Sequence, residues 1–249
     1  MSNDHHISFI TASICGALHQ ARGLPCQDYG CAKSKGQKMV AVVSDGAGSA
    51  KFGRIGAKNV CETLCTELLK SDAGDIRSDV IKAINIARQK LIVHKMNESK
   101  DEQGLVDFSA TLVGVFYYKG KGIFFHIGDG AGVAFKHGNY DNFIISEPEN
   151  GAFACETFFY TMTDWADCLR FQEFENADRI MLMTDGVTCF AFNNDYTSVR
   201  YNFLIPIAEY LENEQSKIYA LEALQNTLNN QKAQHINADD KTILWAKIS

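Results

Sequence analysis

MVAVVSDGAGS, residues 39–49, is the stretch that decides how this chain folds. Its first part, Met39 to Ser44, is a short apolar run rich in β-branched residues, which is typical of a buried strand. Asp45 and the small residues after it do not continue a strand easily, so they predict a tight turn. A carboxylate at the end of a buried strand loses its water and therefore needs a partner or a metal ion.

The segments on either side of this stretch predict sheets with helices in pairs. Helical spacing of apolar residues predicts helices, whereas short apolar or alternating runs predict strands. We expect helices over residues 57–68, 76–91, 203–211 and 217–228, with Pro206 in a first turn. Strands are expected over residues 7–14, 39–44, 109–118, 123–127, 132–135, 143–146, 179–184 and 241–248, and an irregular excursion over 150–178.

Helices that do not alternate one-for-one with strands argue against a doubly wound parallel sheet. The pattern therefore predicts an α+β fold in which two packed antiparallel β-sheets are flanked by helices. The length of 249 residues fits one large domain, and we expect residues 1–249 to form it.

Composition narrows the class of protein. The net charge of −6 gives no general attraction to nucleic acid or to anionic lipid, and no apolar run reaches the length of a membrane span. The eight cysteines contain no C-x-x-C pair, which disfavours a zinc ribbon. Residues 1–6 are polar and do not resemble a signal peptide. We expect reduced thiols in a cytoplasmic, monomeric protein without nucleic-acid or membrane partners.

Aspartates are concentrated at predicted strand ends. Asp45, Asp129 and Asp185 each follow a predicted buried strand and precede a glycine, whereas Asp239 and Asp240 precede the last strand. Asp28 follows the loop that contains Pro25.

Gathered carboxylates would repel one another, and a divalent cation removes that conflict. Oxygen ligands without His or Cys favour Mg²⁺ or Mn²⁺ over zinc. For a single Asp-Gly pair a plain turn is the simpler interpretation, but three pairs, each after a buried strand, favour a metal site.

Six short motifs extend this hypothesis along nearly the whole chain. They are Gln27-Asp28, Ser44-Asp45-Gly46-Ala47-Gly48, Phe108-Ser109-Ala110-Thr111-Leu112, Ile127-Gly128-Asp129-Gly130, Thr184-Asp185-Gly186-Val187 and Asp239-Asp240-Lys241-Thr242. In this order they resemble the motifs of the metal-dependent serine/threonine protein phosphatases of type 2C. The resemblance implies a four-layer αββα sandwich with the metals in a cleft at one end. It also implies hydrolysis of phosphoserine or phosphothreonine in a phosphorylated protein.

The same resemblance implies a role for each acid. Asp45 would bridge two Mn²⁺ or Mg²⁺ ions, and the Gly46 carbonyl would bind one of them. Asp185 and Asp239 would complete the ligands of one ion, and Asp129 would serve a third, weaker ion together with Asp185. Asp28 would orient a metal-activated water that attacks phosphorus in line.

Several positions depart from the family pattern. Many members carry a phosphate-gripping arginine where this chain has Gly23, so Arg22 or His19 would take that role. Ala47 stands where animal members often have a histidine, which leaves the general acid unassigned. Asp240 replaces the usual asparagine, so either Asp239 or Asp240 is the last ligand, and the motif register favours Asp239.

Two other classes of function stay open at this point. A catalytically weak phosphatase-fold binding or regulatory module would fit the missing arginine. A nucleotide phosphate cradle at the Asp45 turn is disfavoured, because the chain has no G-x-x-x-x-G-K-[ST] motif.

Overall fold

The computed structural model describes residues 6–98, 104–149 and 157–249, and within these ranges the strands form two five-stranded sheets. The first sheet, in spatial order, contains β1 (Ile7–Ile14), β10 (Lys241–Ile248), β9 (Arg179–Met183), β6 (Ala131–Lys136) and β7 (Asn139–Ser146). The second contains β2 (Tyr29–Lys35), β3 (Lys38–Ser44), β4 (Leu112–Tyr118), β5 (Lys121–Ile127) and β8 (Arg170–Glu175). Every strand pair in both sheets is antiparallel.

The two sheets pack face to face, and alternation along each strand sorts the side chains between layers. In β4, Val113 and Val115 belong to the core between the sheets, whereas Leu112 and Phe116 face the helices. A strand predicted over residues 109–118 thus contributes to two hydrophobic layers.

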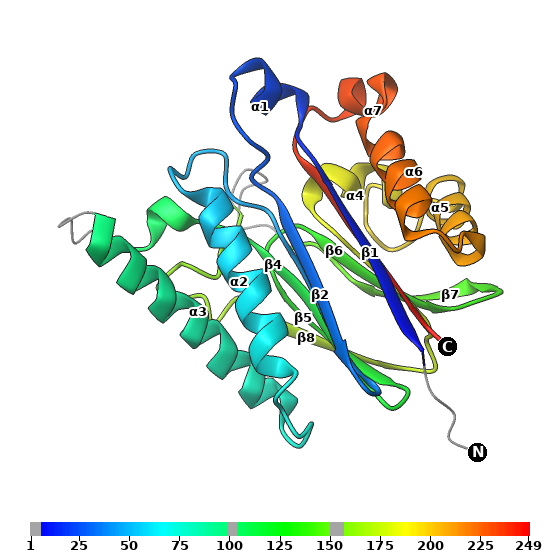
Figure 1. The fold of residues 1–249 in the computed structure, drawn as a ribbon, viewed down its shortest axis with the longest axis horizontal. Helices are drawn as coiled ribbons and strands as arrows, with labels where there is room; N and C mark the ends of the chain where they lie inside the picture. Colours follow the sequence, from blue (N-terminus) through cyan, green and yellow to red (C-terminus); the bar gives the residue numbers. More distant parts are fainter. Residues whose placement is uncertain (1–5, 99–103, 150–156) are drawn as a thin grey trace.

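Helices cover both outer faces of the sandwich (Figure 1). The second sheet lies under α2 (Gly53–Leu68) and α3 (Ile76–Glu98), which follow the decisive turn. The first sheet lies under α4 (Asp185–Ala191), α5 (Tyr201–Asn213) and α6 (Lys217–Asn229). The short helices α1 (Ala17–Ala21) and α7 (Gln231–Ile236) lie at the upper end in Figure 1, and η1 (Val106–Phe108) precedes β4. The predicted αββα sandwich is therefore confirmed.

Parts of the expected secondary structure were wrong. Residues 170–175 form the edge strand β8 rather than part of an irregular excursion, and β2 and α1 were not predicted. Pro206 lies inside α5, beyond the first turn, where it removes one backbone donor. Residues 150–156 of the expected excursion lie outside the described residues.

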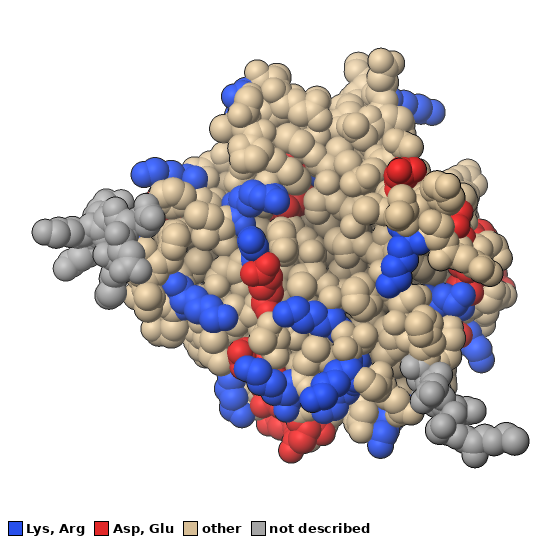
Figure 2. Space-filling model, viewed as in Figure 1, with Lys and Arg blue, Asp and Glu red and all other residues tan. Residues whose placement is uncertain are grey.

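No helix in the described part of the chain is long and apolar enough to cross a membrane. On the face seen in Figure 2, basic side chains are interspersed with acidic ones and do not form one continuous basic patch.

Candidate active site

Strand register brings the predicted aspartates to one end of the sandwich. Ser44 pairs with Tyr29, so Asp45 and Asp28 follow and precede neighbouring strands at the same sheet edge. In the other sheet, Met183 pairs with both Ile243 and Ala131, which places the strand-end acids of β9, β10 and β6 together. We call the five side chains that interact electrostatically there the acidic cluster: Asp28, Asp45, Asp129, Asp185 and Asp239.

Asp45 is fixed through its backbone by the start of β4. Its N–H donates to Thr111 Oγ1 at 3.0 Å, and its carbonyl accepts from the Thr111 N–H at 2.9 Å. Ser44 Oγ donates to the Thr111 carbonyl at 2.6 Å. Both backbone groups of Asp45 therefore have hydrogen-bond partners, so its carboxylate is the part that remains to bind a ligand.

Asp28 is fully buried and held by a threonine from β9's end. Thr184 Oγ1 donates to Asp28 Oδ2 at 2.7 Å and itself accepts from the Thr242 N–H at 2.9 Å. Burial raises the pKa of Asp28 to about 7, and the nearby carboxylates of Asp185 and Asp240 act in the same direction.

The other acids of the cluster are also shifted toward the neutral form. Burial raises the pKa of Asp45 well above its usual range, and the charges of Asp28, Asp239 and Asp129 add to the effect. Burial and the charge of Asp45 do the same to the pKa of Asp185. Burial raises the pKa of Asp129, although Thr157 Oγ1 donates to its Oδ2 at 2.7 Å. The cluster is thus an accumulation of negative charge that protein groups only partly relieve.

One lysine lies close to the cluster without pairing with it. Lys241 is buried, and its Nζ donates to the backbone carbonyl of Asp239 at 2.7 Å and to Gln234 Oε1 at 3.4 Å. Burial lowers the pKa of Lys241, and the neighbouring acids oppose that effect. Within the described residues, no carboxylate of the acidic cluster is part of an ion pair.

The donor set fits a hard divalent cation. Three buried carboxylate oxygens have no hydrogen-bond partner: Asp28 Oδ1, Asp129 Oδ1 and Asp185 Oδ1. Such oxygens are what Mg²⁺ and Mn²⁺ bind. As the side chains stand, no group of three His, Cys, Asp or Glu residues within the described ranges is arranged to hold an ion. Binding therefore requires the carboxylates to turn toward one another.

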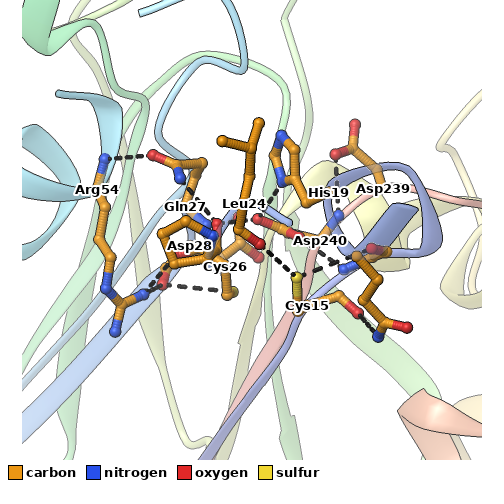
Figure 3. A network of polar contacts seen from close by, with 12 residues as sticks. Cys15, His19, Leu24, Cys26, Gln27, Asp28, Arg54, Asp239 and Asp240 are labelled. Carbon is orange, nitrogen blue, oxygen red and sulfur yellow. Dashed lines mark hydrogen bonds and ion pairs between the residues drawn. The ribbon is translucent and has the colours of Figure 1, made fainter. Parts of the chain in front are cut away.

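Asp240 contacts the loop before Asp28 through its carboxylate (Figure 3). Its Oδ1 accepts from the Gly16 N–H at 2.6 Å, and its Oδ2 accepts from the Gln27 N–H and lies 2.9 Å from His19 Nδ1. His19 is buried with it, so this candidate residue lies beside the site. Arg22, the other candidate for gripping phosphate, is exposed after α1 and has no side-chain hydrogen bond or ion pair to any described residue.

Some residues near the site were missed or misread from the sequence. Arg54 was missed: its Nη1 donates to the carbonyls of Cys26 at 2.6 Å and Asp28 at 3.0 Å. Thr184 was not predicted to contact Asp28. Its position directly before the predicted ligand Asp185 is the sequence signal that could have identified it. Thr157 lies in a segment without any period, and no sequence signal pointed to it.

Tyr160 and His126 are core residues rather than members of the site. Tyr160 is fully buried, and its hydroxyl donates to the Gly56 carbonyl at 2.8 Å. His126 is fully buried in β5, with its Nδ1 3.0 Å from Ser146 Oγ. Neither is a ligand candidate.

Comparison with known proteins identifies the family and the fold. Residues 15–230 match the family model described as protein phosphatase 2C. No curated protein sequence matches the chain.

Solved structures share the fold at low identity. The serine/threonine phosphatase Stp1 from Staphylococcus aureus has a TM-score of 0.68 at 14% identity, over 100% of this chain and 98% of that one. The S. agalactiae serine/threonine phosphatase has a TM-score of 0.66 at 15% identity, over 98% and 100%. The catalytic domain of PstP, solved with two manganese ions, has a TM-score of 0.63 at 14% identity, over 97% and 98%. Since the family model spans most of the sequence, the chain belongs to the protein phosphatase 2C family.

Proposed function

We propose that this protein hydrolyses phosphoserine and phosphothreonine in proteins, with Mn²⁺ or Mg²⁺ ions held by the acidic cluster. The observation that carries the proposal is the gathering of five carboxylates without an ion pair, three of which have an unpartnered buried oxygen. A divalent cation is the ligand that relieves such a cluster. The solved PstP catalytic domain, which holds two manganese ions, supports the choice of metal.

Asp45, the Gly46 carbonyl, Asp185 and Asp239 would hold two ions, and Asp129 with Asp185 would hold a third. When bound, these ions would make a water more acidic and neutralise charge on the phosphoryl oxygens.

Asp28 would orient the attacking water. Its Oδ2 is occupied by Thr184, whereas its Oδ1 is free to accept a hydrogen bond from that water. Positioning by a fixed acceptor lowers the entropic part of the barrier. Either His19 or Arg22 would contact the phosphoryl group. We further propose that the protein acts as a cytoplasmic monomer over one domain, residues 1–249.

Two observations favour the alternative of a catalytically weak binding or regulatory module. In the described ranges no three ligands are arranged for an ion, and no arginine occupies the position that many relatives use for phosphate. That alternative predicts phosphopeptide binding without turnover.

Hydrolysis of an aryl phosphate and of phosphoserine peptides, measured with Mn²⁺ and with chelator, separates the two. We expect turnover only with metal, and its loss in Asp45→Asn. Asp141→Asn, which removes an exposed carboxylate on β7, is the matched control and should behave as wild type. Normal turnover in Asp45→Asn, or turnover that chelator does not reduce, would contradict the proposal.

A further inference from the structure

We propose that Asp240 is a positioning residue, and that together with His19 it fastens residues 15–28 onto the active site and so fixes Asp28. We call Asp240, His19 and the two backbone N–H groups that donate to Asp240 the Asp240 clamp. The consequence for catalysis rests on the proposed function; the clamp itself does not.

Both carboxylate oxygens of Asp240 accept hydrogen bonds from residues 15–28. Only 1% of the residue is exposed, and its carboxylate accepts from Gly16 and Gln27, with His19 Nδ1 at 2.9 Å (Figure 3). Two donors come from the two ends of the loop, eleven residues apart in sequence, so one carboxylate closes the loop. Charge-assisted hydrogen bonds to backbone N–H groups are among the stronger hydrogen bonds in proteins.

His19 connects the clamp to the turn that carries Asp45. Its Nδ1 lies against Asp240, and a Cβ placed on Gly48 would stand 3.4 Å from its Nε2. The imidazole is thus packed between the start of β10 and the turn after β3. Residues from three separate parts of the chain meet at this ring.

The clamp reaches Asp28 through the next residue along the chain. Gln27, whose N–H donates to Asp240, directly precedes Asp28, and Arg54 Nη1 holds the Asp28 carbonyl from α2 at 3.0 Å. At the other end, Leu18 N–H donates to the Ala238 carbonyl at 3.1 Å, which ties α1 to the segment before Asp239. Asp28 therefore has little freedom of backbone position.

An asparagine at position 240 could not accept both of the hydrogen bonds that Asp240 accepts. Its Oδ1 faces the N–H of Gly16 and its Oδ2 faces the N–H of Gln27, and a backbone N–H cannot act as an acceptor. Whichever way the amide is turned, its NH₂ group meets a donor. The aspartate at this position is thus matched to this loop, and its occupied oxygens leave Asp239 as the acid available to the cluster.

The test compares Asp240→Asn, His19→Ala and His19→Asn with wild type. Amide hydrogen exchange reports the clamp without any turnover. In Asp240→Asn, we expect the Gly16 and Gln27 amides to exchange about 10- to 100-fold faster, as for loss of a charge-assisted hydrogen bond, while β3 stays protected. His19→Ala should give a smaller increase and is the milder variant if Asp240→Asn fails to fold.

Kinetics and metal binding then separate positioning from ligation. For Asp240→Asn we expect kcat to fall about 10- to 100-fold, with KM and the Mn²⁺ Kd from calorimetry unchanged. His19→Asn places an amide nitrogen where Nδ1 stood, so it should recover most of the loop protection against hydrogen exchange that His19→Ala loses.

Three outcomes would overturn the proposal. They are an unchanged exchange rate at Gly16 and Gln27 in Asp240→Asn, a weakened Mn²⁺ Kd with normal loop protection, or loop amides that exchange as fast in His19→Asn as in His19→Ala. If wild type hydrolyses no substrate, the proposed function fails, but the exchange measurement still decides whether the clamp exists.

Discussion

The two ends of β9 differ in whether a nearby acid is paired with basic side chains. At its start, Arg179 donates from Nε and Nη2 to the two oxygens of Glu212 at 2.6 and 2.9 Å, and Lys247 lies 2.6 Å from the same carboxylate. Just beyond its other end, Asp185 joins the acidic cluster, where no ion pair is formed within the described residues.

The pKa values follow this difference. Burial opposes ionisation of Glu212, but the bonds from Arg179 and Lys247 outweigh it and hold its pKa below the usual value. Burial and neighbouring carboxylates instead raise the pKa of Asp185. A folded chain can therefore neutralise a buried acid with its own cations, and where it does not, an external cation is the natural partner.

Asp185→Asn should give the largest effect. We expect Mn²⁺-dependent turnover to fall about a thousandfold, because a lost metal ligand removes several kcal/mol of charge stabilisation. The free energy of unfolding in chelator should rise by about 1 kcal/mol, since one repelling charge is removed. Steady-state kinetics and urea unfolding measure the two quantities.

If Asp185→Asn instead destabilised the metal-free protein, the acids would be structural and the contrast between the two ends of β9 would disappear.

Glu212→Gln should have the opposite effects, namely lower stability with unchanged turnover. It leaves the Arg179 guanidinium buried, with only 6% of the side chain exposed, and without its bidentate partner. Breaking a buried pair costs about 3–5 kcal/mol, so the free energy of unfolding should fall by that amount. Turnover of the folded fraction should stay at the wild-type level.

Exposed Glu175, which pairs with Lys121 at the molecular surface, provides the control: Glu175→Gln should leave the free energy of unfolding nearly unchanged, because water screens the pair. Equal losses in both variants would show that burial of the pair is irrelevant.

His126 is a buried group of a third kind, one that stays neutral. Its effect on the pH dependence of stability is the smallest that we predict. Burial, followed by the charge of Arg170, lowers the pKa of His126 well below its usual value, whereas in the unfolded chain it is about 6.5. The unfolded state therefore binds more protons, and this contribution to stability is complete above pH 6.5 and is lost as pH falls. Between about pH 7 and pH 5 it should amount to roughly 2 kcal/mol.

The measurement compares wild type with His126→Asn, whose amide nitrogen replaces Nδ1 beside Ser146. The gap in unfolding free energy between the two proteins should narrow on acidification. A gap independent of pH would mean that the pKa of His126 is the same in the folded and the unfolded chain, and a gap that widened on acidification would mean that His126 is charged in the folded state.

Much of the fold was predictable because inner strands are apolar on both faces. The predictions for the inner strands were close, and the edge strand β1, which is rich in apolar residues, was predicted with its observed bounds, Ile7–Ile14. The edge strands β2 and β8 escaped prediction because they contain many polar residues, so the apolar period is weak. Edge strands depend on a neighbour that the local sequence does not specify.

By itself, the sequence determined the sandwich and the strand-end positions of Asp45, Asp129 and Asp185, because buried runs that end in Asp-Gly are local features. Only the tertiary structure shows which partners the neighbours Asp239 and Asp240 have. The charge of Asp239 acts on Asp45 and Asp185, whereas Asp240 acts on Asp28 and accepts hydrogen bonds from N–H groups of a loop more than 200 residues earlier. The partners of a carboxylate, and hence its role, are set by which distant segments fold against it.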